Sequence, residues 1–397
     1  MIAPMTDSHR LPEIARAFLR LGLTSFGGPI AHLAYFREDL VLRRNWITDA
    51  RYAEIVALSQ FLPGPASSQT AFALGWQRGG ATGALTATLA FTLPSALAMI
   101  LLAAMVGAAP PDEGLAGGLI AGLKITAVAI VAHAVFGMAR MLAPSGARAG
   151  IALAALASLS AMPTAAWMQV VVIAGGALAG LLLRVARLAE AQPQQPLRGP
   201  SRRNAALCAI LFGVLLLLSP LLVGAGIPAR IAEVFYRAGA LVFGGGHVVL
   251  PLLEAGTVQG GLVPEASFLA GYGAAQAMPG PLFTFAGWLG QIAGGPAGAI
   301  IGLIAIFLPG FLLMAAALPF WSAISASHRA RHAGAGANAA VVGVLGAALY
   351  DPVFTGGVTQ SGDFALAVTL FLMLSLWRRP AWQVVITGAL GGMALAL

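Results

Sequence analysis

Two short motifs rich in glycine and proline lie beside polar side chains that could bind an ion. Phe26-Gly27-Gly28 is followed by a proline, and Pro63-Gly64-Pro65 is followed by Ser67, Ser68, Gln69 and Thr70. Proline removes a backbone donor and disrupts the helical turn, so both motifs predict broken helices. A broken helix exposes N-terminal amide groups, which bind anions. The motifs therefore predict a polar cradle for an oxyanion near the middle of the membrane, although kinks that serve only helix packing remain the alternative.

Both motifs return in the second half of the chain, as Phe243-Gly244-Gly245 and Pro279-Gly280-Pro281. A glutamine precedes the first proline by three residues in each copy, and hydroxyl side chains follow both copies. Hydroxyl and amide donors suit an oxyanion that gives up its water shell. From these motifs, the predicted substrate-binding residues are Gly27, Gly28, Gly244, Gly245, Gln60, Pro63, Gly64, Pro65, Ser67, Ser68, Gln69, Gln276, Pro279, Gly280, Pro281 and Thr284.

Three basic residues lie inside apolar segments, and Lys124 is the only lysine of the chain. A charge inside a membrane is costly and is functional by default, so Lys124, Arg20 and Arg237 are predicted to face an anionic substrate. Snorkelling to the membrane interface is the alternative for the two arginines. Asn338 occupies the place of Lys124 in the second half and joins the predicted substrate site. The proton-coupling candidates are Glu54, His133 and His247.

Other kinds of chemistry lack a motif in this sequence. The single cysteine, Cys208, excludes a disulfide framework or a thiolate metal cluster, and the histidines have no metal-ligand spacing. No Walker motif, nucleophile elbow or convincing dinucleotide fingerprint is present. We therefore expect no cofactor, no metal, no catalytic residue and no nucleic-acid partner, and no enzymatic activity.

The composition places these residues in a membrane. Of 397 residues, 59% are hydrophobic and 9% are charged, where soluble domains carry about 25% charged residues. The mean hydropathy of +0.86 agrees with this class. Long continuous apolar runs exclude a β-barrel, and the low polarity excludes disorder. The fold class predicted is an all-α polytopic membrane protein with about 10–13 membrane segments.

The segments form two homologous halves. They are predicted near 15–36, 52–76, 81–107, 115–140, 149–162, 164–183, 204–224, 231–253, 266–289, 292–318, 333–350, 363–376 and 381–397. Shared glycines and prolines hold an offset of 217 to 215 residues over roughly 75 residues, which defines an internal repeat. The predicted domains are a first repeat at 11–185, a basic linker with one joining membrane helix at 186–229, and a second repeat at 230–397.

One joining helix would invert the second repeat if each half crosses the membrane an even number of times. Loops near 140–148, 184–203, 328–332 and 378–379 are basic, whereas those at 107–114, 254–265 and 351–363 carry only acidic charges. The positive-inside rule places the basic loops, the N-terminus and the linker 184–203 in the cytoplasm. Inverted repeats with broken helices at the midplane are typical of secondary transporters. Whether the first two segments of each half span or re-enter the membrane stays open.

The motifs resemble those of the chromate ion transporter family in its long-chain, two-domain form. The resemblance rests on Leu21-Gly-Leu-Thr-Ser-Phe-Gly-Gly-Pro-Ile-Ala-His32, Arg44-x-Trp46, Gln60-Phe-Leu-Pro-Gly-Pro-Ala-Ser-Ser-Gln69, Phe243-Gly-Gly-Gly-His247, Gln276-x-Met-Pro-Gly-Pro281 and Ala348-Leu-Tyr-Asp-Pro352. It covers nearly the whole chain. It implies a protein of the bacterial inner membrane that expels chromate, uses the proton motive force and confers chromate resistance.

Related functions stay open at this point. A sulfate or general oxyanion carrier fits the same site, because chromate and sulfate share shape and charge and discrimination must come from small differences. An anion channel also fits inverted repeats. A membrane enzyme acting on a lipid phosphate needs paired acidic residues, which are scattered here. The expected partners are chromate or a sulfate-like oxyanion and the lipid bilayer, with a second copy of the chain as a further candidate in a homodimer.

Overall fold

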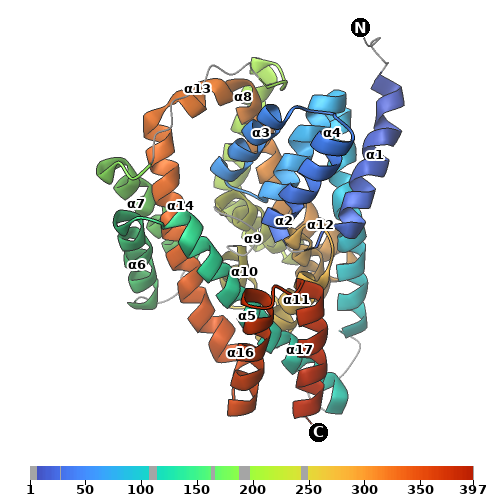
Figure 1. Cartoon of the computed structure of the whole chain (residues 1–397), viewed down its shortest axis with the longest axis vertical. Coiled ribbons are helices and arrows are strands. Elements are labelled where there is room, and N and C mark those ends of the chain that lie inside the picture. The colour runs from blue at the N-terminus through green and yellow to red at the C-terminus, as the bar shows by residue number, and fades with distance from the viewer. Residues whose placement is uncertain are drawn as a thin grey trace.

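The computed structural model describes residues 7–26, 28–106, 114–161, 166–186, 197–242 and 249–396. The part of the chain within these ranges is helical with short connections and contains no β-strand. Figure 1 shows a bundle whose N-terminus and C-terminus lie at opposite ends of its long axis. The all-α membrane fold is thereby confirmed.

The first half consists of eight helical elements. The first four are α1 (Asp7–Thr24), α2 (Gly28–Phe36), the π-helix η1 (Arg37–Arg43) and α3 (Asp49–Phe61). The next four are α4 (Ala66–Val106), α5 (Gly114–Leu142), α6 (Gly146–Ala161) and α7 (Ala166–Leu183). A joining helix α8 (Arg202–Leu218) and the 3₁₀ turn η2 (Ser219–Ala225) lead into the second half.

The second half repeats this order. It opens with α9 (Ile227–Leu241), α10 (Val249–Thr257), α11 (Glu265–Ala277) and the 3₁₀ turn η4 (Leu282–Thr284). It continues with α12 (Phe285–Ala317), η5 (Leu318–Phe320), α13 (Trp321–Ala326) and α14 (His328–Ala348). It closes with η6 (Leu349–Phe354), α15 (Thr355–Gly357), α16 (Ser361–Ser375) and α17 (Ala381–Leu395).

The first segments of the first half fold as helical hairpins. Glu13 near the start of α1 accepts a hydrogen bond from the indole nitrogen of Trp46 at 2.9 Å, so the chain returns after α2 and η1 to the level at which α1 began. Arg78 also pairs with Glu13 at 3.0 Å, so the α3 hairpin returns to that level too. The predicted segments 15–36 and 52–76 therefore each divide into two arms, with breaks between α1 and α2 and at the Pro63-Gly64-Pro65 loop.

Two paired glycines turn each long helix back on itself. In α4, Gly79 and Gly80 have φ/ψ of −142°/22° and 62°/−151°, and Gly294 and Gly295 in α12 have nearly the same angles, −153°/24° and 63°/−158°. Gly75 consequently lies against Gly83 and Ala84 across the turn. Each helix thus consists of two antiparallel arms, at 66–78 and 81–106 in α4 and at 285–293 and 296–317 in α12. The positive φ of Gly80 and Gly295 is a conformation that glycine adopts at no steric cost.

The two halves have opposite orientation across the membrane. Residues 77 and 198 exchange two hydrogen bonds, which brings the start of α8 to the side of Glu13, Trp46 and Arg78. We call this side, which also carries Arg37, Arg43 and Arg44, the basic side. The start of α9 lies at the other end of α8, where Arg230 donates to the Gly260 carbonyl. The first repeat therefore enters from the basic side and the second from the opposite side, which confirms the inverted repeat.

The later helices of each half pack against the other half through small residues. In α5, Gly118 and Gly122 contact Gly392 and Gly388 of α17, while in α14 Gly336 contacts Gly176 and Gly180 of α7. Because small residues let helix backbones approach closely, these contacts allow van der Waals packing where lipid gives no hydrophobic gain. The halves are interlocked and are not two side-by-side bundles.

Within the described ranges, five helices are long and apolar enough to cross a membrane, by length and composition: Ala66–Val106, Gly117–Leu142, Arg202–Leu221, Leu282–Ala323 and His328–Gly357. Four further apolar helices are shorter: Gly146–Ala161, Met168–Leu183, Ser361–Ser375 and Ala381–Leu395. The joining helix α8 lies at the periphery, where Leu207, Ile210 and Leu217 are exposed. The protein is a multi-pass membrane protein.

Candidate functional site

The Pro-Gly-Pro loop of each repeat binds the broken end of the first helix of the other repeat. The Gly64 amide donates to the Val242 carbonyl at 2.7 Å, and the Gly280 amide donates to the Ser25 carbonyl at 2.9 Å. Val242 and Ser25 follow the ends of α9 and α1 and are equivalent in the repeat. We call the place defined by these four residues the crossing. The backbone at the crossing is not helical and is not exposed to lipid. Membrane proteins tolerate non-helical backbone only where it is buried in protein or lines a cavity.

Both central glycines are required by the geometry of the crossing. Gly64 has a φ of +127° and Gly280 a φ of +96°. A Cβ atom on Gly64 would lie 3.1 Å from the Gly310 Cα and 2.7 Å from the Gln69 Nε2. A Cβ atom on Gly280 would lie 2.9 Å from the Ser95 Oγ. Since Ser95 and Gly310 each follow a helical proline, the loops also contact the proline kinks of α4 and α12.

Polar side chains after the first loop are buried at the N-terminus of α4. Ser67, Ser68, Gln69 and Thr70 are 0–3% exposed. The Gln69 amide donates to the Pro63 carbonyl at 2.9 Å and to the Gly310 carbonyl at 3.0 Å, while its Oε1 has no partner among the described residues. Thr70 donates to Ser59 at 2.9 Å, and the Ser68 hydroxyl has no described partner. The α4 N-terminus thus presents polar atoms that are free to bind a ligand.

The second loop carries fewer polar side chains. Thr284 is buried and donates to the Pro281 carbonyl at 2.8 Å. Gln276 is half-buried and hydrogen bonds to Tyr272, but its Nε2 has no described partner. The equivalent Gln60 is exposed. Of the remaining predicted residues, Gly28 begins α2 with a φ of +77°, and Pro63, Pro65, Pro279 and Pro281 form the loops themselves.

Four predicted residues in or next to the two Phe-Gly-Gly motifs fall outside the described residues. They are Gly27 of the first repeat and Gly244, Gly245 and His247 of the second.

Lys124 and Asn338 are half-buried on the equivalent helices α5 and α14. The neighbouring Leu123 carbonyl contacts Gly273 of α11, the arm that leads to the second Pro-Gly-Pro loop. Lys124 makes no hydrogen bond or ion pair with any residue in the described ranges. A lysine without such a partner inside a 26-residue apolar span is a candidate for a functional role.

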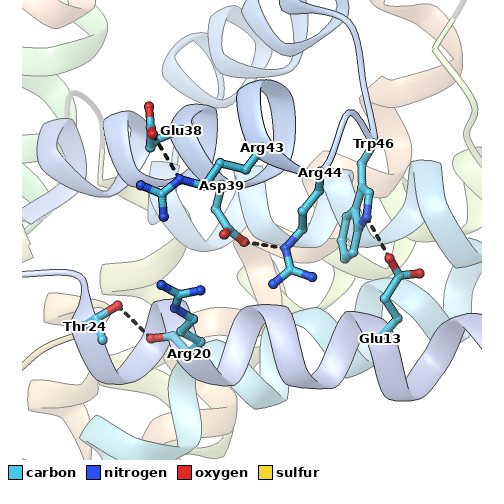
Figure 2. Close-up of polar contacts among 8 residues, drawn as sticks. All are labelled: Glu13, Arg20, Thr24, Glu38, Asp39, Arg43, Arg44 and Trp46. Atoms are coloured by element: carbon cyan, nitrogen blue, oxygen red, sulfur yellow. Dashed lines mark hydrogen bonds and ion pairs between the residues drawn. The ribbon is translucent and has the colours of Figure 1, made fainter.

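The two predicted arginines differ in their surroundings. Arg237 forms an ion pair with Glu233 at 3.0 Å, one helical turn earlier in α9. The repeat offset places Arg16 at the position of Glu233, so Arg20 lacks the equivalent acidic partner. Figure 2 shows the Arg20 guanidinium directed from α1 toward η1, where Arg43 pairs with Glu38 and Arg44 with Asp39. Arg20 is exposed on the basic side, whereas Arg237 is neutralised by its ion pair with Glu233.

A cluster at the basic side was missing from the predicted site. Trp46 donates to Glu13, and the guanidinium groups of Arg44 and Arg78 lie 5.7 Å and 5.0 Å from the centre of its ring (Figure 2 shows Glu13, Arg44 and Trp46). Cations over an aromatic face are stabilised by the ring quadrupole. Arg44-x-Trp46 is one of the motifs that carry the family resemblance. Together with the acidic Glu13 in the first segment, it was the signal in the sequence for this cluster.

The loop beside this cluster carries a further exposed pair. Arg37 donates to Asp49 at 2.7 Å, and this hydrogen bond holds the pKa of the Asp49 carboxyl below its usual range. Both side chains are about half exposed, so solvent screens the pair.

The proton-coupling candidates lie apart from the crossing loops in sequence and on different helices. Glu54 is buried on α3, and its Oε2 has no described partner. His133 is half-buried on α5, with its ring 6.3 Å from that of Phe371 and its Nδ1 without a described partner. Both remain predictions.

We expect Glu13→Ala to destabilise the protein more than Arg37→Ala does. Removing Glu13 leaves both Trp46 and Arg78 without this acceptor, which costs on the order of 1–3 kcal/mol for a partly buried group. Arg37 contributes little because its pair is exposed. Thermal unfolding of the purified variants, followed by tryptophan fluorescence, measures both. Equal midpoints for the two variants would contradict this account of the cluster.

Inverted repeats that cross at paired re-entrant loops define the class of this protein as a membrane transporter. The chromate transporter family matches residues 12–181 and 229–393, so the chain belongs to this family. It is 28% identical over 350 residues to a chromate transport protein of Pseudomonas aeruginosa, covering 86% of this chain and 80% of that protein. It is 30% identical over 327 residues to a probable chromate transport protein of Synechococcus elongatus, covering 79% and 77%.

A chromate transport protein of Cupriavidus metallidurans is 29% identical over 321 residues, covering 79% of this chain and 75% of that protein. No solved structure matches the chain. The family membership agrees with a transporter and not with an enzyme.

Proposed function

We propose that this protein exports chromate across the bacterial inner membrane and so confers chromate resistance. The observation that carries the proposal is the crossing, where each Pro-Gly-Pro loop is bound by the other repeat beside the buried N-terminus of α4. Helix N-termini supply amide donors to an anion, and buried hydroxyl and amide groups add directional hydrogen bonds. A tetrahedral dianion of the size of chromate fits this donor set. Family relatives named as chromate transport proteins support the choice of ion.

The distribution of charge supports export as the direction. Arg20, which has no acidic partner among the described residues, lies on the basic side beside the ion pairs Arg43–Glu38 and Arg44–Asp39 (Figure 2), and the positive-inside rule favours a cytoplasmic location for this side. On the other side, Glu254 lies near Asp351 and Glu265, which disfavour an anion. An anion is therefore attracted from the cytoplasm, and acidic groups promote its departure outside.

The proton motive force is the proposed driving force, with Glu54, His133 and His247 as the candidate proton carriers. We also propose that the N-terminus and the linker 184–203 lie in the cytoplasm, in agreement with the positive-inside rule. The proposed domains are the first repeat at 11–185, the linker with its joining helix at 186–229 and the second repeat at 230–397. Coupling of proton entry to anion exit requires that both ions bias one conformational equilibrium.

Uptake of labelled chromate into everted vesicles tests this function. We expect accumulation above that of empty vesicles when a proton gradient is imposed, and little accumulation without one. Vesicles with a proton ionophore serve as the control, because they keep the protein and lose the gradient. Accumulation that is identical with and without the gradient would indicate a channel. No uptake with the protein present would contradict chromate export.

Excess sulfate in the same assay measures selectivity. We expect sulfate to compete weakly, because relatives named for chromate imply that small differences in size and hydrogen bonding are used. Full inhibition at equal concentrations would instead indicate a general oxyanion carrier.

A further inference from the structure

Two polar side chains at the first break have no role in the fold. Ser25 and His32 lie on either side of the break at residues 25–28, and they are 0% and 1% exposed. The Ser25 hydroxyl and both ring nitrogens of His32 lack a partner of good hydrogen-bond geometry among the described residues. One ring nitrogen of His32 approaches the Ser25 backbone closely enough for a weak hydrogen bond, so the Ser25 hydroxyl and the other ring nitrogen are the groups left without a described partner. A buried side chain with unpaired polar atoms calls for a physical reason.

The second repeat shows that the fold does not need these polar groups. The offset of 217 residues pairs Ser25 with Val242 and His32 with Val249, and both valines are 0% exposed. The Val242 carbonyl accepts from Gly64 as the Ser25 carbonyl accepts from Gly280. Since only backbone atoms make these bonds, an apolar side chain supports the same architecture. The hydroxyl and the imidazole are extra chemistry present in the first repeat.

Burial of unpaired donors is unfavourable, so a partner is expected. A serine hydroxyl carries one donor, and an imidazole ring carries at least one in any protonation state. Leaving a buried donor unsatisfied costs on the order of 1–3 kcal/mol. Valine at both sites would avoid this cost, as it does in the second repeat. The missing partner must therefore accept hydrogen bonds, which oxyanions do at every oxygen.

The pair faces the second Pro-Gly-Pro loop. The Ser25 carbonyl binds the Gly280 amide, and Gly280 in turn lies next to Ser95 and the Phe91 carbonyl. The His32 ring packs edge-on against the Phe91 ring, with centroids 5.6 Å apart at 87°. This contact holds the imidazole ring against α4. Both donors are held at the crossing, where the first and second repeats meet.

We propose that the Ser25 hydroxyl and the His32 imidazole donate hydrogen bonds to the transported oxyanion, on the first-repeat side of the crossing. The inference rests on the proposed function in that the cargo is a tetrahedral oxyanion. It makes the site asymmetric, because the equivalent positions of the second repeat are the apolar Val242 and Val249. The pair determines affinity and has no part in holding the fold together.

The test compares Ser25→Val and His32→Val with the wild-type protein. Each variant copies the residue that the second repeat already accommodates. We expect each to raise the Kd for chromate about 10-fold or more, the effect of losing one hydrogen bond to a charged group. Without anion, the midpoint of thermal unfolding should stay equal or rise, because an unsatisfied buried group is removed. His32→Gln keeps a donor and should recover part of the affinity.

Binding is measured by calorimetry and by the shift of the unfolding midpoint on the purified full-length protein, with chromate, sulfate and molybdate as probes. Ser158→Val is the matched control, since Ser158 is an exposed helical serine that bonds only to its own helix. Unchanged Kd values in folded Ser25→Val and His32→Val would overturn the inference. The inference would also be overturned if the two variants unfold at a lower midpoint without anion and their folded fraction binds the anion with unchanged affinity.

The probes separate this inference from the proposed function. If the wild-type protein binds sulfate or molybdate but not chromate, and the binding requires Ser25 and His32, chromate export fails and the inference stands. If the wild-type protein binds chromate and neither variant weakens it, the function stands and the inference fails. A wild-type protein that binds none of the three ions overturns the inference.

Discussion

Replacing Gly64 or Gly280 with alanine is expected to reduce transport by about 10-fold to 100-fold, from backbone strain on the order of 1–3 kcal/mol. Both residues have φ values that side chains rarely adopt, +127° and +96°. A Cβ atom on Gly64 would also meet the Gly310 backbone at 3.1 Å, which cannot move without α12. The substitution therefore displaces the loop that the other repeat binds. Initial rates of chromate uptake in vesicles, normalised to protein content, measure the effect.

Gly80→Ala is the matched control for this prediction. Gly80 also has a positive φ, +62°, but no heavy atom lies within 4 Å of a Cβ placed there. This variant carries backbone strain without a clash and lies at the turn on the basic side, away from the crossing. It should lose stability of about 1 kcal/mol and retain most transport. Equal loss of transport in Gly80→Ala and Gly64→Ala would show that general destabilisation, and not the crossing, is responsible.

Lys124→Gln is expected to reduce chromate transport about 10-fold to 100-fold, the effect of losing one charge-assisted hydrogen bond. The lysine is half-buried in an apolar span and has no ion pair among the described residues, so removing its charge frees no carboxylate. The folded protein should be as stable as the wild type or more stable, because a desolvated charge is lost. Arg140→Gln is the control, since Arg140 lies in the last turn of the same helix and stacks on Phe136 at 4.1 Å.

Lys124 is the only lysine in the sequence, so an amine-reactive reagent labels its side chain without interference from other lysines. The N-terminal amine is the second target and serves as the internal reference. Chromate should slow labelling of Lys124 and leave labelling of the N-terminal amine unchanged. Lys124 labelling that is indifferent to chromate, together with normal transport by Lys124→Gln, would remove this residue from the site.

Several features of the fold could be predicted because they depend on residue type alone. The low content of charge required a membrane, and glycine and proline at matched offsets defined two homologous halves. One joining helix predicts inversion if each half crosses the membrane an even number of times, and the structure has the inverted arrangement. The breaks at Phe-Gly-Gly and Pro-Gly-Pro followed from missing backbone donors, and the structure has breaks at both Pro-Gly-Pro loops and between α1 and α2.

The partners of these breaks could not be predicted, because they come from the other half of the chain. Gly64 binds Val242, and Gly280 binds Ser25, over separations that local patterns do not encode. The pairing of α5 with α17 and of α14 with α7 is equally remote. The reversal of the chain at Gly79-Gly80, which brings Gly75 against Gly83, also appears only in the tertiary structure.

The charged residues illustrate the same division. Residue type identified Arg20, Arg237 and Lys124 as charges within apolar segments. Only the structure distinguishes Arg237, which is neutralised by Glu233, from Arg20 and Lys124, which are not paired within the described residues. The sequence by itself determined the class and the repeat, since these follow from composition and periodicity, and its motifs carried the resemblance to the family. The tertiary structure decided which polar groups stay unpaired at the crossing, because hydrogen-bond satisfaction depends on distances between residues that only folding brings together.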